Sequence, residues 1–152
     1  MSIMTVASSA RKEFKMFSLS NNSKYTGYTL FGKYHGYGTM IYPDGSKYIG
    51  NWEFGKRNGY GCMVYFNQNT YKGSWRDDTF DGDGIFQFYR GSFYDGEWTE
   101  GNRDGCGVSI YTNGDYYVGS WKNNKKHGFG VKISEKDGNY SGQWKYGLEC
   151  SR

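Results

Sequence analysis

A period of 23 residues runs through this chain and restricts its fold more than any other feature of the sequence. Segments close to the form Tyr-x-Gly-x-Trp begin at residues 25, 48, 71, 94, 117 and 140, without insertion or deletion between them. Each of the five complete units continues with a Gly-x-Gly pair, and in all but the last an aromatic residue follows four positions later. A fixed period of this length is typical of repeat proteins, in which each unit packs only on its neighbours.

Each unit has the pattern of a β-hairpin. Residues 48–53 alternate as a strand does, residues 54–58 are predicted to form a loop, and residues 59–66 are predicted to form a second strand. Five complete units and a half unit then give about eleven antiparallel strands, spanning roughly 50 Å at about 4.8 Å per strand. The expected fold class is therefore all-β, an elongated and twisted single-layer antiparallel sheet of consecutive hairpin repeats.

The composition supports a thin sheet and a reducing compartment. Apolar residues make up 36% of the chain and aromatic residues 20%, while glycine contributes 24 residues and proline one. Rings that cover glycine-rich backbone suit this composition better than a deep aliphatic core. The three cysteines show no CxxC spacing, and no segment resembles a secretion signal or a membrane span. We therefore expect a cytoplasmic protein.

The repeated pattern Y-x-G-x-W-x-x-G-x-x-x-G-x-G-x-x-x-Y resembles the MORN ("membrane occupation and recognition nexus") repeat over residues 25–147. The resemblance implies a repeat domain over residues 25–152, with a half repeat from residue 140. Three positions depart from the family pattern: Thr29 replaces the first Trp, and Asp78 and Asn124 replace a loop glycine. The first unit therefore resembles a degenerate cap, and the two loop changes put only the local turn shape in doubt.

One segment, GNWEFGKR at residues 50–57, is close to a nucleotide-binding phosphate loop. Its glycines are positions of the repeat, and equivalent glycines recur at residues 96 and 101 and at 142 and 147. A phosphate loop must leave a strand and open a helix, whereas residues 51–53 continue a strand. We therefore expect no nucleotide cofactor here.

The residues that could bind a metal ion are badly spaced for one. Cysteines 62, 106 and 150 are two repeats apart from one another, about 19 Å along the sheet. His35 and His127 occupy one position of the repeat four units apart, and we expect them in surface loops. An acidic run beginning at Asp77 resembles a calcium loop, but Phe88 stands where the bidentate Glu is required. No metal site, and no catalytic grouping of an enzyme, is expected.

The aromatic columns are the strongest candidates for a binding site. Tyr, Gly and Trp alternate along the first strand of each unit and so share one face, while Val64, Ile85, Val108, Ile110, Val131 and Ile133 lie on the other. Rings that cover neighbouring glycines have a structural role, yet a one-layer sheet cannot hide both faces. The expected partner-binding residues are Tyr71, Trp75, Tyr94 and Trp98, then Trp52 and Trp121, with the acidic loop residues Asp77, Asp78, Asp81 and Asp104 beside them.

Charge decides between two functions that the resemblance implies. Relatives include cytoskeletal scaffolds, ciliary components and adaptors that hold a partner helix, and also proteins that associate with phosphoinositide membranes. A lipid-binding site would use Lys56, Arg57, Lys125 and Lys126, but nine acidic and four basic residues in 71–116 interrupt this basic rim. The same objection applies to nucleic acid. We therefore expect a non-enzymatic scaffold whose groove takes a helical or extended protein segment of basic character, with peripheral membrane association as the alternative.

The N-terminal 24 residues precede the repeats and mix apolar with basic side chains. We expect part of this tail to pack on the sheet or on a partner, and a short helix over Ala10–Phe17 is one form that it could take. The sequence gives no indication of homo-oligomerisation.

Overall fold

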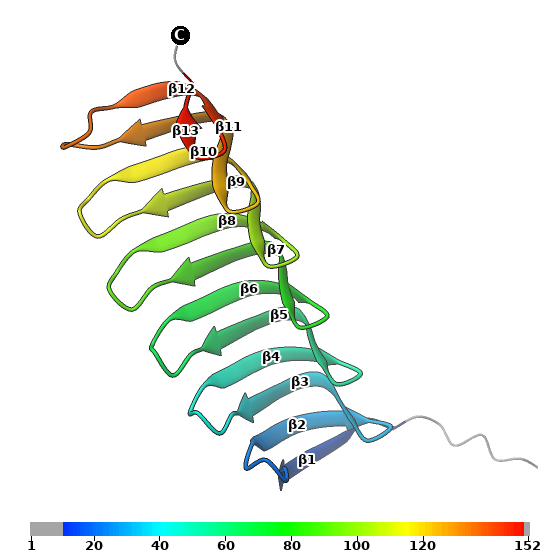
Figure 1. Cartoon of the computed structure of the whole chain (residues 1–152). Helices are drawn as coiled ribbons and strands as arrows, with labels where there is room; N and C mark the ends of the chain where they lie inside the picture. Colours follow the sequence, from blue (N-terminus) through cyan, green and yellow to red (C-terminus); the bar gives the residue numbers. More distant parts are fainter. Residues whose placement is uncertain (1–10, 151–152) are drawn as a thin grey trace, which may run out of the picture.

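The computed structural model describes residues 11–150, which form one antiparallel sheet of 13 strands in which each strand pairs with its neighbours in sequence (Figure 1). The strands are β1 (Glu13–Ser18), β2 (Lys24–Leu30), β3 (Lys33–Ile41), β4 (Lys47–Glu53), β5 (Lys56–Val64), β6 (Thr70–Arg76), β7 (Thr79–Gln87), β8 (Phe93–Thr99), β9 (Asn102–Ile110), β10 (Tyr116–Lys122), β11 (Lys125–Ile133), β12 (Tyr140–Lys145) and β13 (Leu148–Glu149). No helix occurs in this described range. The predicted all-β repeat sheet is confirmed, and β1 and β13 are additional to the eleven predicted strands.

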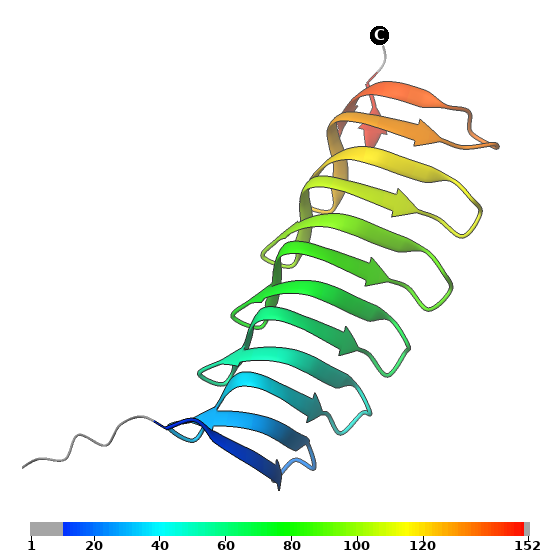
Figure 2. The same cartoon turned by 180° about the vertical axis from the view of Figure 1, so that it is seen from behind.

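The sheet is a long trough rather than a flat plate. Its strands stack one above another along the molecule and curve along their length, as the two opposite views show (Figures 1 and 2). A register shift lies between the central glycine and the tryptophan of the first strand in repeats two to five, for example between Gly50 and Trp52. Bulges of this kind bend a strand and increase its twist, so the same bend recurs in each of these repeats.

The hairpin tips are tighter than the sequence suggests. Phe54 and Gly55 alone connect β4 to β5, with φ angles of 46° and 95°, and Glu53 pairs with Lys56. Positive φ at both central residues defines a type I′ turn, whose twist lets strand pairing continue up to the turn. The expected five-residue loop over 54–58 is therefore wrong, because Lys56 and the two residues after it already belong to β5.

The Tyr and Trp columns form the core of the sheet. Five tyrosines, at positions 25, 48, 71, 94 and 117, are at most 1% exposed, and the five tryptophans are 3–8% exposed. Tyr71, for example, packs edge-to-face against Trp75 and Trp98, with centroid distances of 5.2 and 5.6 Å. The sequence analysis treated these rings as partly exposed, whereas a neighbouring side chain covers each of them.

Cross-strand glycine pairs make this burial possible. Gly73 pairs with Gly84, and the ring of Tyr71 lies directly on both glycines. The Tyr71 hydroxyl donates a hydrogen bond to the carbonyl of Ser74 at 2.8 Å. The indole nitrogen of Trp75 donates to the carbonyl of Gly61 in the preceding repeat at 3.3 Å. Each repeat is thereby linked to the one before it by both packing and a buried hydrogen bond.

The N-terminal segment forms a strand where a short helix was considered. β1 pairs with β2 from Glu13 opposite Thr29 to Ser18 opposite Lys24. Its Phe17 ring lies 5.8 Å from the ring of Tyr25 and covers the first repeat. Strand pairing wins here because β2 would otherwise present an unpaired edge. Ala10, at the start of the proposed helix, lies outside the described residues.

Substituting Gly84 with Ala tests the packing of tyrosine on glycine. The new Cβ would lie far inside van der Waals contact with the Tyr71 hydroxyl, so we expect Gly84→Ala to lower the free energy of unfolding by about 2–3 kcal/mol. Urea denaturation followed by circular dichroism measures this loss. The control Gly55→Asn places at a turn a residue type that repeat five carries at the same position, and should change stability by less than about 0.5 kcal/mol. Equal effects of the two substitutions would contradict this account.

Burial of the tyrosines predicts a loss of stability in alkali. Burial raises the pKa of Tyr25 and of Tyr117 to about 12, and raises the pKa of the three tyrosines between them in the same direction. A folded-state pKa above the unfolded value of about 10 gives stability that is complete below pH 10 and is lost as the pH rises toward 12. We expect the free energy of unfolding to fall steeply across that window. Ultraviolet absorbance of tyrosinate should show that the buried tyrosines ionise cooperatively as the protein unfolds. Independent ionisation of all tyrosines near pH 10 in a folded protein would contradict this prediction.

Candidate functional site

The face of the sheet that carries the Tyr and Trp columns also carries further side chains in each repeat, two of which lie in the strands opposite these rings, and we call it the groove face. The first position pairs across the hairpin with the tryptophan, or with Thr29 in repeat one, and is called here the Trp-facing position. Its members are Tyr34, Arg57, Phe80, Arg103 and Lys126. The second position pairs with the tyrosine, and its members are Met40, Met63, Phe86, Ser109 and Lys132. These side chains cover the core rings and vary from repeat to repeat.

Each Trp-facing side chain lies on two core rings. Phe80 stacks on Tyr71 at 3.7 Å and meets Trp98 of the next repeat at 5.3 Å. The Arg103 guanidinium lies 5.5 Å from the Tyr94 centroid and 4.5 Å from that of Trp121. Aromatic and cationic side chains can both satisfy this position, because the face of an aromatic ring attracts either a ring edge or a cation.

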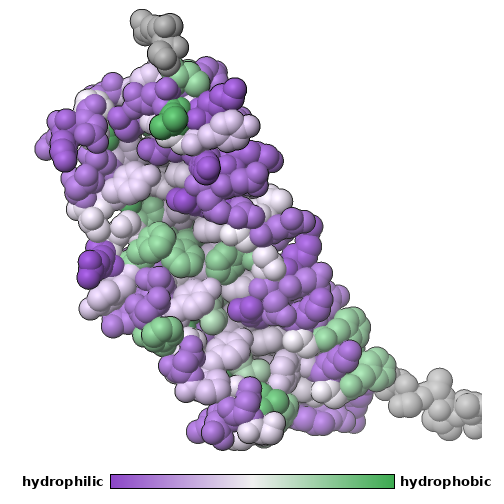
Figure 3. All heavy atoms as spheres, in the orientation of Figure 1, coloured by the Kyte–Doolittle hydropathy of each residue, from purple (hydrophilic) through white to green (hydrophobic). Residues whose placement is uncertain are grey.

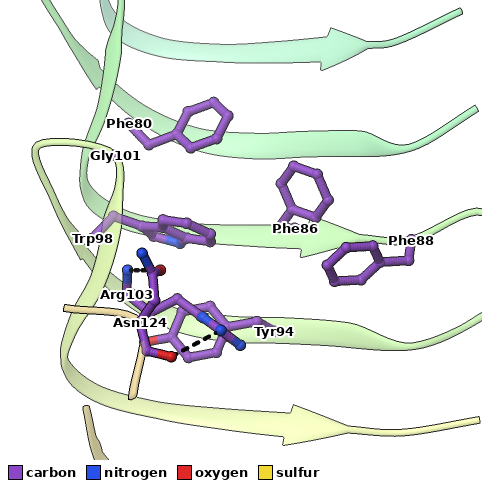
Figure 4. Close-up of a pocket in the computed structure, with 8 residues that line it drawn as sticks. All are labelled: Phe80, Phe86, Phe88, Tyr94, Trp98, Gly101, Arg103 and Asn124. Carbon is purple, nitrogen blue, oxygen red and sulfur yellow. Dashed lines mark hydrogen bonds between the residues drawn. The ribbon is translucent and has the colours of Figure 1, made fainter. Parts of the chain in front are cut away.

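The best-formed pocket lies where repeat three meets repeat four. Its volume is about 260 Å³, and its lining consists of Phe80, Phe86, Phe88, Tyr94, Trp98, Gly101, Arg103 and Asn124 (Figure 4). The position that pairs with the tyrosine holds a large side chain in the first three repeats and Ser109 in the fourth.

Three phenylalanines form an apolar wall of the pocket. The Phe86 and Phe88 ring centroids are 4.8 Å apart, and Phe86 also lies 6.2 Å from Phe80. Phe88 is 44% exposed, far more than the core rings beneath it. Figure 3 shows a group of hydrophobic side chains over the middle of the sheet, while hydrophilic side chains predominate along much of its two long edges. Exposed aromatic surface beside a pocket makes this part of the groove face the candidate interaction site.

The acidic loop residues lie on the rim formed by the hairpin tips, and their charges are already paired. Asp77 lies 3.0 Å from Lys56, Asp78 2.9 Å from Arg57, Asp81 3.0 Å from Arg76, and Asp104 3.1 Å from Lys122. These four carboxylates were predicted to attract a basic partner. Ion pairs within the chain neutralise them, so the structure gives no support to that role.

Comparison with known proteins identifies the repeats. The family pattern described as the MORN repeat matches residues 25–47, 48–70, 71–93, 94–116, 117–138 and 140–151. The chain belongs to the MORN-repeat family. A search among curated proteins finds no match.

A solved structure is distantly similar to this chain: "SAS-4 (dCPAP) TCP domain in complex with a Proline Rich Motif of Ana2 (dSTIL) of Drosophila Melanogaster". The TM-score is 0.46 at 14% sequence identity, over 93% of this chain and 83% of that one. So distant a likeness carries no functional conclusion.

Two departures from the MORN pattern are explained by arginines one repeat earlier. Asp78 replaces the turn glycine after Arg57, and Asn124 replaces it after Arg103, whereas Gly55, Gly101 and Gly147 follow the Trp-facing Tyr, Phe and Lys. Asp78 accepts hydrogen bonds from both the backbone N–H and the Nε of Arg57, at 3.0 and 2.9 Å. Its φ of 68° keeps the turn geometry that glycine normally provides. The sequence analysis found these departures but not their cause.

Other candidate sites of the sequence analysis lack a functional arrangement. Gly50 to Arg57 forms a strand, a two-residue turn and the start of β5, with no helix to bind phosphate. Cys62, Cys106 and Cys150 are free thiols. No group of three His, Cys, Asp or Glu side chains is placed to hold a metal ion within the described chain. Residues 11–150 also contain no helix that could cross a membrane.

The two histidines lie in strands and not in the surface loops expected for them. His35 is in β3 and packs against Phe54, and His127 is in β11 and packs against Tyr146. The two-residue turns place this position inside the second strand of the repeat. It therefore contacts the hairpin tip of the next repeat.

The pairing of Arg57 with Asp78 can be tested by a double-mutant cycle. Asp78→Gly relieves the backbone strain of a non-glycine residue at positive φ. It also removes the ion-pair partner of Arg57, whose side chain is 19% exposed. We expect a net loss of about 0.5–1 kcal/mol, the scale of a half-exposed ion pair. In the Arg57→Phe background, which reproduces the Phe80–Gly101 combination of repeat three, the same substitution should cost nothing. An equal loss in both backgrounds, measured by urea denaturation, would show that the two residues are not coupled.

Proposed function

We propose that this protein is a non-enzymatic scaffold or adaptor that binds a protein segment along the groove face, with an apolar side chain anchored in the pocket of Phe80, Phe86 and Phe88. The observation that carries the proposal is that Phe88 is exposed, and Phe80 and Phe86 only partly buried, above a core that is otherwise covered. Large aromatic side chains around a well-packed pocket are where interface energy concentrates.

The size and setting of the pocket favour a peptide over a small molecule. Its volume of about 260 Å³ falls below the range of roughly 300–1,000 Å³ usual for small-molecule sites. A second hollow lies two repeats away and includes Tyr42, Met63 and Tyr65. Hollows that follow one another along the sheet suit an elongated partner, either a helix or an extended segment.

The predicted partner-binding rings take a different part in this proposal. Tyr94 and Trp98 line the pocket directly. Trp52, Tyr71, Trp75 and Trp121 lie beneath the groove side chains and hold them in position. Substituting these buried rings would lower stability and binding together, so they are poor probes of function.

Membrane association through the basic rim is the weaker candidate. Lys56 and Arg57 are in ion pairs with Asp77 and Asp78, and Lys126 lies on the ring of Trp144 at 4.8 Å. Of the four expected lipid-binding residues, only Lys125 is left without such a contact among those described. A cytoplasmic setting in a cytoskeletal or ciliary assembly belongs to the proposal and rests on the family resemblance alone.

A matched pair of surface substitutions tests the proposal. Phe88→Glu changes the groove face, and Tyr60→Glu changes an aromatic residue on the opposite face that is 54% exposed. We expect both variants to fold, and affinity capture from the native cell with quantitative mass spectrometry to find partners that Phe88→Glu loses at least tenfold and Tyr60→Glu retains. Loss of the same partners from both variants, or from neither, would contradict groove binding. Strong binding of both variants to phosphoinositide vesicles would favour the membrane alternative.

A further inference from the structure

Three of the five Trp-facing positions carry a cation, and the chain neutralises only one of them. Arg57 makes an ion pair with Asp78, which follows it by one repeat at the hairpin tip. Arg103 and Lys126 make no ion pair with any carboxylate of the described residues. Comparison of the turn residue that follows each cation by one repeat shows that Arg103 and Lys126 lack a carboxylate partner.

Arg103 reproduces the geometry of Arg57 except for the carboxylate. In repeat two the Arg57 backbone N–H donates to the Asp78 side chain at 3.0 Å, and the guanidinium donates to the Asp78 carbonyl at 3.0 Å. In repeat four the Arg103 backbone N–H donates to the Asn124 side chain at 2.9 Å, and the guanidinium donates to the Asn124 carbonyl at 3.0 Å. The neutral amide of Asn124 thus occupies the place of the Asp78 carboxylate, so the charge of Arg103 stays uncompensated.

Lys126 has neither a carboxylate nor an amide side chain beside it at the equivalent turn position. The turn residue that follows it by one repeat is Gly147, whose N–H donates to the Lys126 carbonyl at 2.8 Å. The Lys126 ammonium lies 4.9 Å from the ring centroid of Tyr117 and 4.8 Å from that of Trp144. Aromatic faces hold this cation on the groove, and no carboxylate of the described residues lies within ion-pair distance of it.

Both cations are partly withdrawn from water. Burial lowers the pKa of Arg103 and also that of Lys126. A partly desolvated cation is stabilised by an opposite charge. A guanidinium with N–H groups available can donate two parallel hydrogen bonds to one carboxylate. The positions are therefore prepared for an anionic partner group.

The two cations also lie next to the apolar anchor site. Arg103 lines the phenylalanine pocket (Figure 4). Lys126 occupies the same position of the repeat one unit further along the sheet. Two strands separate successive repeats, so the spacing is about 9.6 Å. Carboxylates seven residues apart on a helix, or three apart in an extended chain, span about 10 Å.

We propose that the segment bound in the groove is acidic, with an apolar side chain in the phenylalanine pocket and carboxylates on Arg103 and Lys126. This inference rests on the proposed function and specifies its partner. It reverses the basic partner expected from the sequence, because the acidic residues that suggested it are paired on the rim. The contact between Asp78 and Arg57 shows that an arginine at the Trp-facing position can pair with a carboxylate.

A carboxylate introduced at the turn by mutation would compete with the partner's carboxylate for each cation. Asn124→Asp and Gly147→Asp place a carboxylate beside Arg103 and Lys126, as Asp78 is placed beside Arg57. The control Gly55→Asp adds the same charge at the same turn position beside Tyr34, where a Cβ meets no atom within 4 Å. The variants change neither the pocket phenylalanines nor the cations themselves.

The probe is a displayed library of random peptides, selected on the full chain and measured afterwards by fluorescence polarisation. We expect enriched peptides to combine an aromatic or aliphatic residue with two or more acidic residues, and their affinity to fall about tenfold with Asn124→Asp or Gly147→Asp but not with Gly55→Asp. Phe88→Glu should abolish their binding.

The outcomes separate this inference from the proposed function. Peptides that require Phe88 but show no acidic bias, or are insensitive to Asn124→Asp and Gly147→Asp, would overturn the acidic partner and leave groove binding standing. Peptides indifferent to Phe88→Glu, or the absence of any enriched peptide, would count against both. Preferential binding of inorganic phosphate or phosphopeptides at the two cations would replace the carboxylate with another anion.

Discussion

The close contact between a tyrosine ring and a cross-strand pair of glycines is the interaction on which this sheet depends. Gly73 and Gly84 lack the Cβ atoms that would hold the Tyr71 ring away from the backbone, so the ring lies flat and its hydroxyl reaches the carbonyl of Ser74. In repeats two to five the tryptophans of two adjacent repeats then close around the tyrosine. The side chains on one face of this single layer thereby form a core that excludes water. In most proteins a sheet needs a second layer of structure to form such a core.

This arrangement separates stability from recognition. The glycines, tyrosines and tryptophans are the same in nearly every repeat and are buried, whereas the groove side chains above them differ from one repeat to the next. A ring face accepts Tyr34, Phe80 or Arg103 with similar geometry. The groove can therefore change its shape and charge along its length without disturbing the core. The phenylalanine pocket and the two uncompensated cations arise from that freedom.

The sequence analysis predicted the repeat boundaries and fold class correctly but misjudged the role of the aromatic columns. Alternation showed that Tyr71 and Trp75 share a face, yet it could not show that side chains such as Phe80 and Phe86 would cover them. Likewise, the acidic run from Asp77 was visible, but its partners lie in the preceding hairpin or in the same one. Which carboxylate meets which cation depends on the stacking of neighbouring tips.

The sequence by itself determined the period, the strand order and the face on which the rings lie, because these follow from local patterns repeated in register. The tertiary structure alone decided which charges are free. Asp78 and Asn124 occupy the same place in their repeats, and only their contacts one repeat earlier show that the first neutralises an arginine and the second does not. The physical reason is that such pairing joins residues about 21 positions apart, at distances set by the twist and bulges of the sheet.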